Sequence, residues 1–301
     1  MAIKIISDSS CDISLEEAKK LDLEIIPFYV SFDGKNYIKE QVDIETQAFY
    51  EKMLENPKVF PKSSLPSIQD YVDVFTKYAE KGDDIICVCI TSKFSGSYNS
   101  ACNAAEIVKS DYPNVKITAI NSMVNTVLQG LIVKEIIRMR DNGLSYEEII
   151  ENTERIKKTG RIIFTIGGME YLLKGGRVGK VLSGAVSKFK VMPIITLTEG
   201  EIFPSGICRS RQSSISKVIE KFKSHMINEK INMKDYVFAT GYGYDIDEAL
   251  EFKKRIYETG KELCDDFEIT LERIGSTIAV HTGPHALGVG FVEKYDAHMN
   301  K

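Results

Sequence analysis

The stretch IICVCITSKFSGS, residues 85–97, decides the fold class of this chain. Residues 85–91 form a continuous apolar run of strand length, and a loop of serine and glycine follows it. A helix is predicted to begin at about Ser97. A short strand that is apolar throughout and leads through a polar loop into a helix is typical of a parallel sheet covered by helices on both faces.

The same order of elements recurs through the first half of the chain. Short apolar runs at 3–7, 115–120 and 162–166 predict further strands. Serines that open helices support this alternation, because a Ser-x-x-Glu or Ser-x-x-Asp pattern satisfies free N–H groups of the first helical turn. These capping serines are Ser14, Ser67 and Ser145. Asp33-Gly34, between two strand-like runs, predicts a hairpin at a sheet margin or in a flap.

After Gly167-Gly168 the pattern changes to strands of antiparallel character. A second hairpin is predicted around Glu199-Gly200, and helices and strands alternate after it. We therefore predict an α/β fold with two α/β domains. Residues 1–158 form a domain with a mostly parallel sheet flanked by helices, and residues 159–301 form a mixed α/β domain.

Composition excludes several classes of protein. The chain has 301 residues, 43% of them apolar and 27% charged, with a net charge of −4, so it has neither the composition of a disordered chain nor the basic surface of a nucleic-acid-binding protein. The longest uncharged stretch, 117–133, is too short and too polar to span a membrane. The N-terminus lacks the features of a secretory signal, which predicts a cytoplasmic protein. Six cysteines without a CxxC pair predict reduced, buried thiols.

Three polar loops follow strands or precede helices, where ligands of open α/β sheets bind. They span residues 7–10, 62–67 and 91–97. Free N–H groups at a helix N-terminus, with serine hydroxyls beside them, suit an anionic oxygen of a carboxylate or phosphate. The alternative is that each serine only caps its helix.

The glycine-rich segment 174–180 displays Arg177 but fails as a phosphate loop, because Lys174 and Val181 replace the required glycine and hydroxyl residue. Further along, Arg209 and Arg211 offer two more guanidinium groups. His281 and His285 have the four-residue spacing of metal ligands on a helix, but Gly283-Pro284 breaks that helix, so no metal is expected. A serine nucleophile is disfavoured because no Gly-x-Ser-x-Gly turn is present.

Taken in order, five segments resemble the DegV family of bacterial fatty-acid-binding proteins along nearly the whole chain. They are residues 5–12, 62–67, 91–101, 172–177 and 281–284. The resemblance implies one long-chain fatty acid between the two domains. Hydroxyls and a histidine would bind its carboxylate, and the C-terminal domain would enclose its tail.

Carried over by position, the resemblance assigns ligand-binding roles to residues of these segments. The resulting set is Ser63, Ser64, Ser95, Gly96, Arg177, His281 and Thr282. Neither a catalytic residue nor a metal ligand is implied. Departures from the family pattern are Leu65, Asn121 and His285, the last of which replaces a glycine.

In the family, the binding protein presents the acyl carboxylate to a separate ATP-dependent kinase, which forms an acyl phosphate for phospholipid synthesis. The resemblance therefore implies a carrier without catalysis or cofactor of its own, with palmitate, stearate or oleate as ligand and the kinase subunit as partner. Two alternatives stay open. One is an enzyme of the same fold acting on a small phosphorylated or acylated substrate, which a convergence of Arg177, Arg209 and Arg211 would favour. The other is a lipid-sensing regulatory protein.

Overall fold

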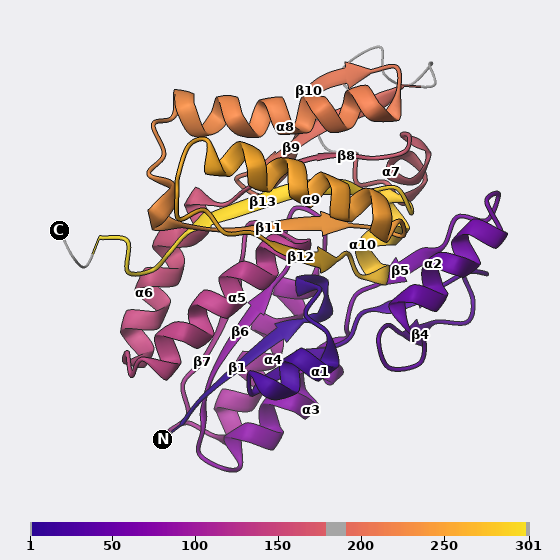
Figure 1. The fold of residues 1–301 in the computed structure, drawn as a ribbon. Coiled ribbons are helices and arrows are strands. Elements are labelled where there is room, and N and C mark those ends of the chain that lie inside the picture. The colour runs from indigo at the N-terminus through magenta and orange to yellow at the C-terminus, as the bar shows by residue number, and fades with distance from the viewer. Residues whose placement is uncertain (1, 179–190, 299–301) are drawn as a thin grey trace.

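The computed structural model describes residues 2–178 and 191–298. Its N-terminal half contains a four-stranded parallel sheet in the order β2-β1-β6-β7 (Figure 1). The strands are β1 (Ile3–Asp8), β2 (Leu23–Ile26), β6 (Asp84–Cys89) and β7 (Ile117–Asn121). Every residue of β6 is buried. The apolar run that predicted this strand is thus explained by burial on both faces, and the parallel sheet is confirmed.

Helices cover both faces of this sheet. They are α1 (Leu15–Lys20), α3 (Ile68–Ala79), α4 (Ser97–Asp111), α5 (Thr126–Asp141) and α6 (Tyr146–Ile156). Side chains of α3 and α4, such as Tyr71 and Ala101, pack on one face with Ile85 of β6. Leu128 and Ile132 of α5 pack in a different cluster. Three of the helices begin at the predicted serines, whose side chains accept hydrogen bonds from the first turn.

A six-stranded mixed sheet forms the C-terminal half, in the order β10-β9-β8-β13-β11-β12. The strands are β8 (Arg161–Thr165), β9 (Met192–Thr198), β10 (Glu201–Cys208), β11 (Tyr236–Tyr242), β12 (Thr270–Arg273) and β13 (Leu287–Glu293). Glu199 and Gly200 have φ angles of 51° and 83°, as a tight turn between two antiparallel strands requires, so the predicted hairpin is confirmed.

One helix lies between the two sheets. The outer face of the six-stranded sheet is covered by α8 (Arg211–Asn228) and α9 (Ile246–Lys261), while its inner face packs on α5 (Figure 1). Helix α5 also contacts β1 of the parallel sheet. A single hydrophobic cluster therefore runs from Ile5 through α5 to Val292.

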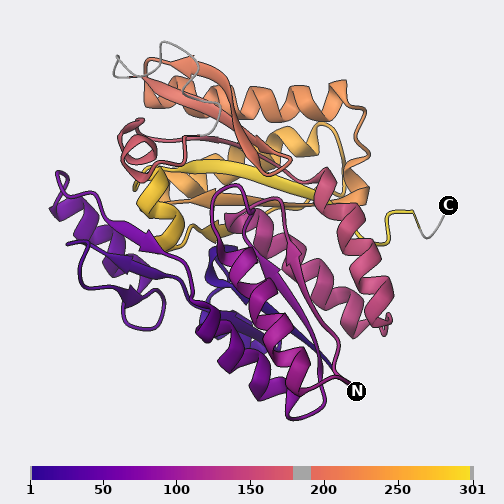
Figure 2. The ribbon, with the colours of Figure 1, turned by 180° about the vertical axis from the view of Figure 1, so that it is seen from behind.

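A smaller lobe projects beside the parallel sheet (Figure 2). It holds a three-stranded antiparallel sheet of β3 (Tyr29–Ser31), β4 (Ile38–Lys39) and β5 (Lys62–Ser64), with α2 (Thr46–Glu55). Residues 62–64 are therefore a strand, and the prediction of a loop over residues 62–67 was wrong for its first three residues. Phe49 and Tyr50 of α2 pack against α10 (Ser276–Thr282), which links the lobe to the C-terminal half.

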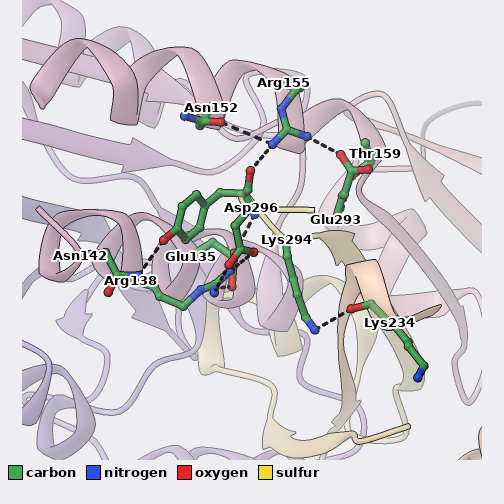
Figure 3. A network of polar contacts seen from close by, with 11 residues as sticks. Glu135, Arg138, Asn142, Asn152, Arg155, Thr159, Lys234, Glu293, Lys294 and Asp296 are labelled. Atoms are coloured by element: carbon green, nitrogen blue, oxygen red, sulfur yellow. Dashed lines mark hydrogen bonds and ion pairs between the residues drawn. The ribbon is translucent and has the colours of Figure 1, made fainter. Parts of the chain in front are cut away.

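Polar contacts join the halves a second time, near the C-terminus (Figure 3). Arg138 of α5 donates to the Asp296 carboxylate at 2.7 and 2.8 Å and to Glu135 at 2.8 Å. Arg155 of α6 donates to Glu293 of β13 at 2.5 Å. The parallel sheet ends at residue 121 and the mixed sheet begins at 161, but the halves share core and polar contacts, so the boundary at 158/159 stays a prediction.

Candidate functional site

A cavity of about 210 Å³ lies between the halves, lined mainly by apolar side chains. Ile90 and Phe94 line it from the end of β6 and the loop after it, Val127 from α5, and Phe164 and Leu287 from β8 and β13. A water molecule needs only about 10–15 Å³ of such space, and an apolar cavity of about 150 Å³ already holds benzene. The cavity is therefore suited to an apolar ligand larger than a single ring.

Six polar residues of the predicted set line this cavity. They are Ser63, Ser64, Ser95, Arg177, His281 and Thr282. Gly96 does not line it; a Cβ there would instead lie 3.5 Å from Leu65. Segments far apart in the sequence thus supply polar side chains to one cavity.

Ser63 and His281 contact each other across the joint between the lobe and the C-terminal half. Ser63 Oγ lies 3.0 Å from His281 Nε2, which places the middle of β5 against the last turn of α10. Burial, together with the positive charge of Arg177, lowers the pKa of His281 to about 4. The imidazole is therefore neutral near pH 7 and can donate one hydrogen bond.

Close packing against α7 (Glu170–Gly175) holds the His281 ring in place. A Cβ at Gly175 would lie only 2.2 Å from His281 Nδ1, so no other residue fits there without moving the ring. Two residues on, Arg177 donates to the carbonyl of Gly175 at 2.8 Å and to that of Phe94 at 3.1 Å. Arg177 thereby joins the loop of Ser95 to the segment that packs on His281.

A buried carboxylate, that of Asp8, holds the loop that carries Ser95 through hydrogen bonds. Asp8, at the end of β1, accepts hydrogen bonds from Ser10 Oγ at 2.5 Å, Ser97 Oγ at 2.7 Å, Gln129 Nε2 at 2.8 Å and Ile90 N at 3.0 Å. Burial raises the Asp8 pKa, and these four donors oppose that rise. Two donors flank the loop, so Asp8 fixes both of its ends.

Residues 7–10 were predicted as an anion-binding loop, and this prediction was wrong. Ser9 and Ser10 are fully buried, and neither lines the cavity. Ser9 Oγ donates to Glu40, and Ser10 Oγ donates to Asp8. Because β1 lies inside the sheet beneath α5, the hydroxyls that follow it satisfy protein carboxylates.

The other arginines named above do not reach the cavity. Arg211 donates to Glu248 at 2.5 and 2.8 Å, and neither Arg209 nor Arg211 lines the cavity. The convergence that would favour a small-substrate enzyme is therefore absent. Gly179 and Lys180, compared above with a phosphate loop, lie outside the described residues.

The described residues do not assemble a nucleophile with its base and orienting acid. His281 contacts Ser63, while Ser95 Oγ accepts from Ser97 N at 3.2 Å. In residues 2–178 and 191–298, no carboxylate contacts His281 Nδ1, and no cluster of three His, Cys, Asp or Glu could hold a metal. His285 is exposed and is not among the residues with positive φ, so it needs no glycine-like backbone.

Three further polar residues line the cavity that no sequence motif indicated: Asn125 and Thr126 at the start of α5, and Thr277 in α10. Thr126 has a φ of 53°, a left-handed conformation that is unusual for a β-branched residue. Its hydroxyl donates to the Asp12 carboxylate. Asn125 is a residue type favoured at helix N-caps and could have marked this helix start, although its side chain makes no cap in the structure.

The fold and cavity define a class of α/β proteins that enclose an apolar space between a parallel and a mixed sheet. This chain belongs to the DegV family, whose profile, described as an uncharacterised protein family, matches residues 2–294. A DegV domain-containing protein of Clostridium perfringens is 30% identical, with 98% of this chain and 100% of that protein covered.

Solved structures share the whole fold. A fatty acid (stearic acid)-binding protein from Eubacterium ventriosum is 40% identical, with a TM-score of 0.92 over 98% of this chain and 99% of the other. DegV of Bacillus subtilis, named a fatty acid binding protein, is 25% identical with a TM-score of 0.82, covering 98% of this chain and 100% of that one. No helix in the described part of this chain is long and apolar enough to cross a membrane.

Proposed function

We propose that this protein binds a long-chain fatty acid in the cavity and holds its carboxylate at the polar group. The observation that carries the proposal is the grouping of six polar residues on a cavity that is otherwise largely apolar. Within this proposal, the hydroxyls of Ser63, Ser64, Ser95 and Thr282 receive the carboxylate, together with His281 and Arg177. The stearic acid named for the Eubacterium ventriosum protein supports this ligand class.

The binding free energy of such a ligand depends mainly on how well its carboxylate is hydrogen-bonded. Burial of a chain of palmitate length gains about 11 kcal/mol gross, at about 0.8 kcal/mol per methylene. An ionised carboxylate without partners would cost many kcal/mol in a dry site. Charge-assisted hydrogen bonds of about 1.5–3 kcal/mol each offset that cost, and the Arg177 charge favours the anion further.

Native mass spectrometry of the protein as purified is the first test. We expect a long-chain fatty acid at one molecule per chain, released on denaturation. The variants His281→Ala and Ser95→Ala are expected to fold and to bind added oleate or palmitate at least tenfold more weakly, because each removes about 1.5–3 kcal/mol of charge-assisted bonding.

Matched controls are Ser92→Ala and His285→Ala, which change the same loop and the segment just after α10 outside the cavity. Their ligand occupancy should equal that of the unchanged protein. An empty protein that takes up neither oleate nor palmitate would overturn the proposed function. Unaltered affinity in both cavity variants would overturn the assignment of the carboxylate site.

We further propose that the protein is a cytoplasmic carrier that presents the carboxylate to a separate ATP-dependent fatty-acid kinase. In that reaction a carboxylate oxygen attacks the γ-phosphorus of ATP and ADP leaves. The exposure of Arg177 beside the polar group supports access from outside. A purified kinase subunit should co-elute with the loaded protein and form acyl phosphate. A lipid-sensing protein would hold the ligand but fail both assays, which would overturn the kinase partnership alone.

A further inference from the structure

We propose that Glu40 is a positioning residue for the fatty-acid site: its carboxylate caps α10 from the lobe, and its charge opposes that of the ligand carboxylate. The inference rests on the proposed binding of a fatty acid. Its consequence is that the affinity for the ligand falls as the pH rises and Glu40 ionises.

The start of α10 has no side-chain cap of its own. Its N-cap residue is Gly275, so the free N–H groups of the first turn need an acceptor from elsewhere. Glu40, which follows β4 and is fully buried, supplies one, because its Oε2 accepts from Thr277 N at 2.7 Å. Its Oε1 accepts from Ser9 Oγ, just after β1. Glu40 therefore ties α10 to both the lobe and the parallel sheet.

This cap bears on the carboxylate site because α10 also carries His281. The helix is seven residues long, and His281 lies in its last turn, where it contacts Ser63. Thr277 and His281 are therefore only about 6 Å apart along the axis, at 1.5 Å per residue. A shift at the start of so short a helix moves its end, so the Glu40 contact helps to fix the His281 ring.

A second carboxylate, that of Asp12, lies beside the cap. A Cβ at Gly275 would lie 2.7 Å from Asp12 Oδ1 and 3.5 Å from Glu40 Oε2, so the two carboxylates meet at one glycine. Asp12 Oδ1 is buried and has no hydrogen-bond partner among the described residues. Each of the two neighbouring carboxylates therefore opposes ionisation of the other.

The surroundings of this pair are mainly acidic. The other titratable groups near Glu40 and Asp12 are Asp8, Tyr50, Tyr242, Glu272 and Arg273, and Lys134 pairs with Glu272 at 3.2 Å. Burial is the main reason that the pKa of Glu40 is raised to about 7; the charge of Asp8 acts in the same direction, and the two hydrogen-bond donors act against it. Glu40 therefore changes its charge near neutral pH.

The sign of the pH effect follows from these positions. When Glu40 is protonated, its O–H can donate to Ser9 Oγ while its other oxygen still accepts from Thr277 N, so the cap persists. When Glu40 is ionised, its charge lies at one end of α10 and the ligand carboxylate at the other, and the two anions repel in a site shielded from water. The ligand therefore binds more tightly to the protonated form, and its binding draws a proton onto Glu40.

The test measures dissociation constants of the lipid-free protein for hexadecanoic acid at pH 6, 7 and 8.5, below the concentration at which the acid aggregates. The ligand is ionised throughout this range, because the ordinary pKa of its carboxyl group is close to that of glutamic acid. We expect the dissociation constant to rise about tenfold from pH 6 to pH 8.5, since a repulsion that raises the Glu40 pKa by about one unit changes the affinity tenfold.

Glu40→Gln keeps the cap, because the amide oxygen accepts from Thr277 N and the amide N–H donates to Ser9, but it cannot ionise. Its dissociation constant at pH 6 should stay within about threefold of that of the unchanged protein, and the rise with pH should disappear. Glu45→Gln makes the same change at an exposed residue of the lobe outside the cavity and should keep the rise. Glu40→Ala removes the cap and should bind about tenfold more weakly than Glu40→Gln at pH 6.

A dissociation constant that does not change with pH in the unchanged protein, or a rise that Glu40→Gln retains, would overturn the role of the Glu40 charge. Equal affinities in Glu40→Ala and Glu40→Gln would overturn its role as the cap of α10. A protein that binds no hexadecanoic acid at any of the three pH values would instead overturn the proposed function.

Discussion

Replacement of Asp8 by alanine is expected to lower the free energy of unfolding by about 3–5 kcal/mol, because four buried hydrogen bonds are lost and a buried donor left without an acceptor costs about 1–3 kcal/mol. Ser10, Ile90, Ser97 and Gln129 would each lose a hydrogen bond. Ser10 Oγ also donates to Gln129 Oε1, and Gln129 Nε2 also donates to Ser7 Oγ, so these two groups keep another acceptor. Ser10 and Ile90 follow β1 and β6, and Ser97 and Gln129 lie in the first turns of α4 and α5. Chemical denaturation monitored by circular dichroism measures the change.

A matched control is Asp73→Ala, which removes an exposed carboxylate that accepts from Gln69 Nε2 on α3. Its effect should stay within about 0.5 kcal/mol. Asp8→Asn keeps the shape of the side chain but turns an amide donor toward other donors. Its loss in free energy of unfolding should therefore fall between the losses in Asp8→Ala and Asp73→Ala. A loss below about 1 kcal/mol in Asp8→Ala would contradict the role of this carboxylate as the support of the Ser95 loop.

Gly175→Ala is expected to weaken fatty-acid binding at least tenfold with little loss of stability. The new Cβ would lie 2.2 Å from His281 Nδ1, so the ring must move away from Ser63. Displacing one charge-assisted donor costs about 1.5–3 kcal/mol, which is at least a tenfold change in affinity. Titration calorimetry with a long-chain fatty acid measures it.

For the neighbouring glycine, Gly176, we expect the reverse: a loss of stability without a loss of ligand affinity. Gly176 has a φ of 68° and open space around its Cβ position. Gly176→Ala should therefore cost about 1–2 kcal/mol of stability through backbone strain and leave ligand affinity near that of the unchanged protein. Equal affinities in both alanine variants would show that the position of His281 does not govern binding.

The strands buried on both faces could be predicted from the sequence because each is an unbroken apolar run. Strand β13 lies at the centre of the mixed sheet but was not predicted, since Gly288 and Gly290 interrupt its pattern. A Cβ at Gly288 would lie 2.5 Å from that of Phe164 on β8, so close strand packing requires the glycine. Helix α2 was also missed, because no side chain caps its start.

The site could be anticipated only through the resemblance to known proteins. Ser63 and His281 are 218 residues apart, and no local pattern indicates that they meet. Serine-rich loops alone predicted three anion sites, of which residues 7–10 satisfy buried carboxylates instead. Asn125 and Thr277 belong to no motif, so only the folded structure places them on the cavity.

The position of α5 between the two sheets limits how a ligand can enter. Its residues pack against β1 on one side and against β11 and β13 on the other. If the halves rotated apart about a hinge, one face of this helix would be exposed to water, at about 25 cal/mol for each Å² uncovered. Because β5, α7 and α10 also line the cavity, a local displacement of one of them would open it without exposing this helix.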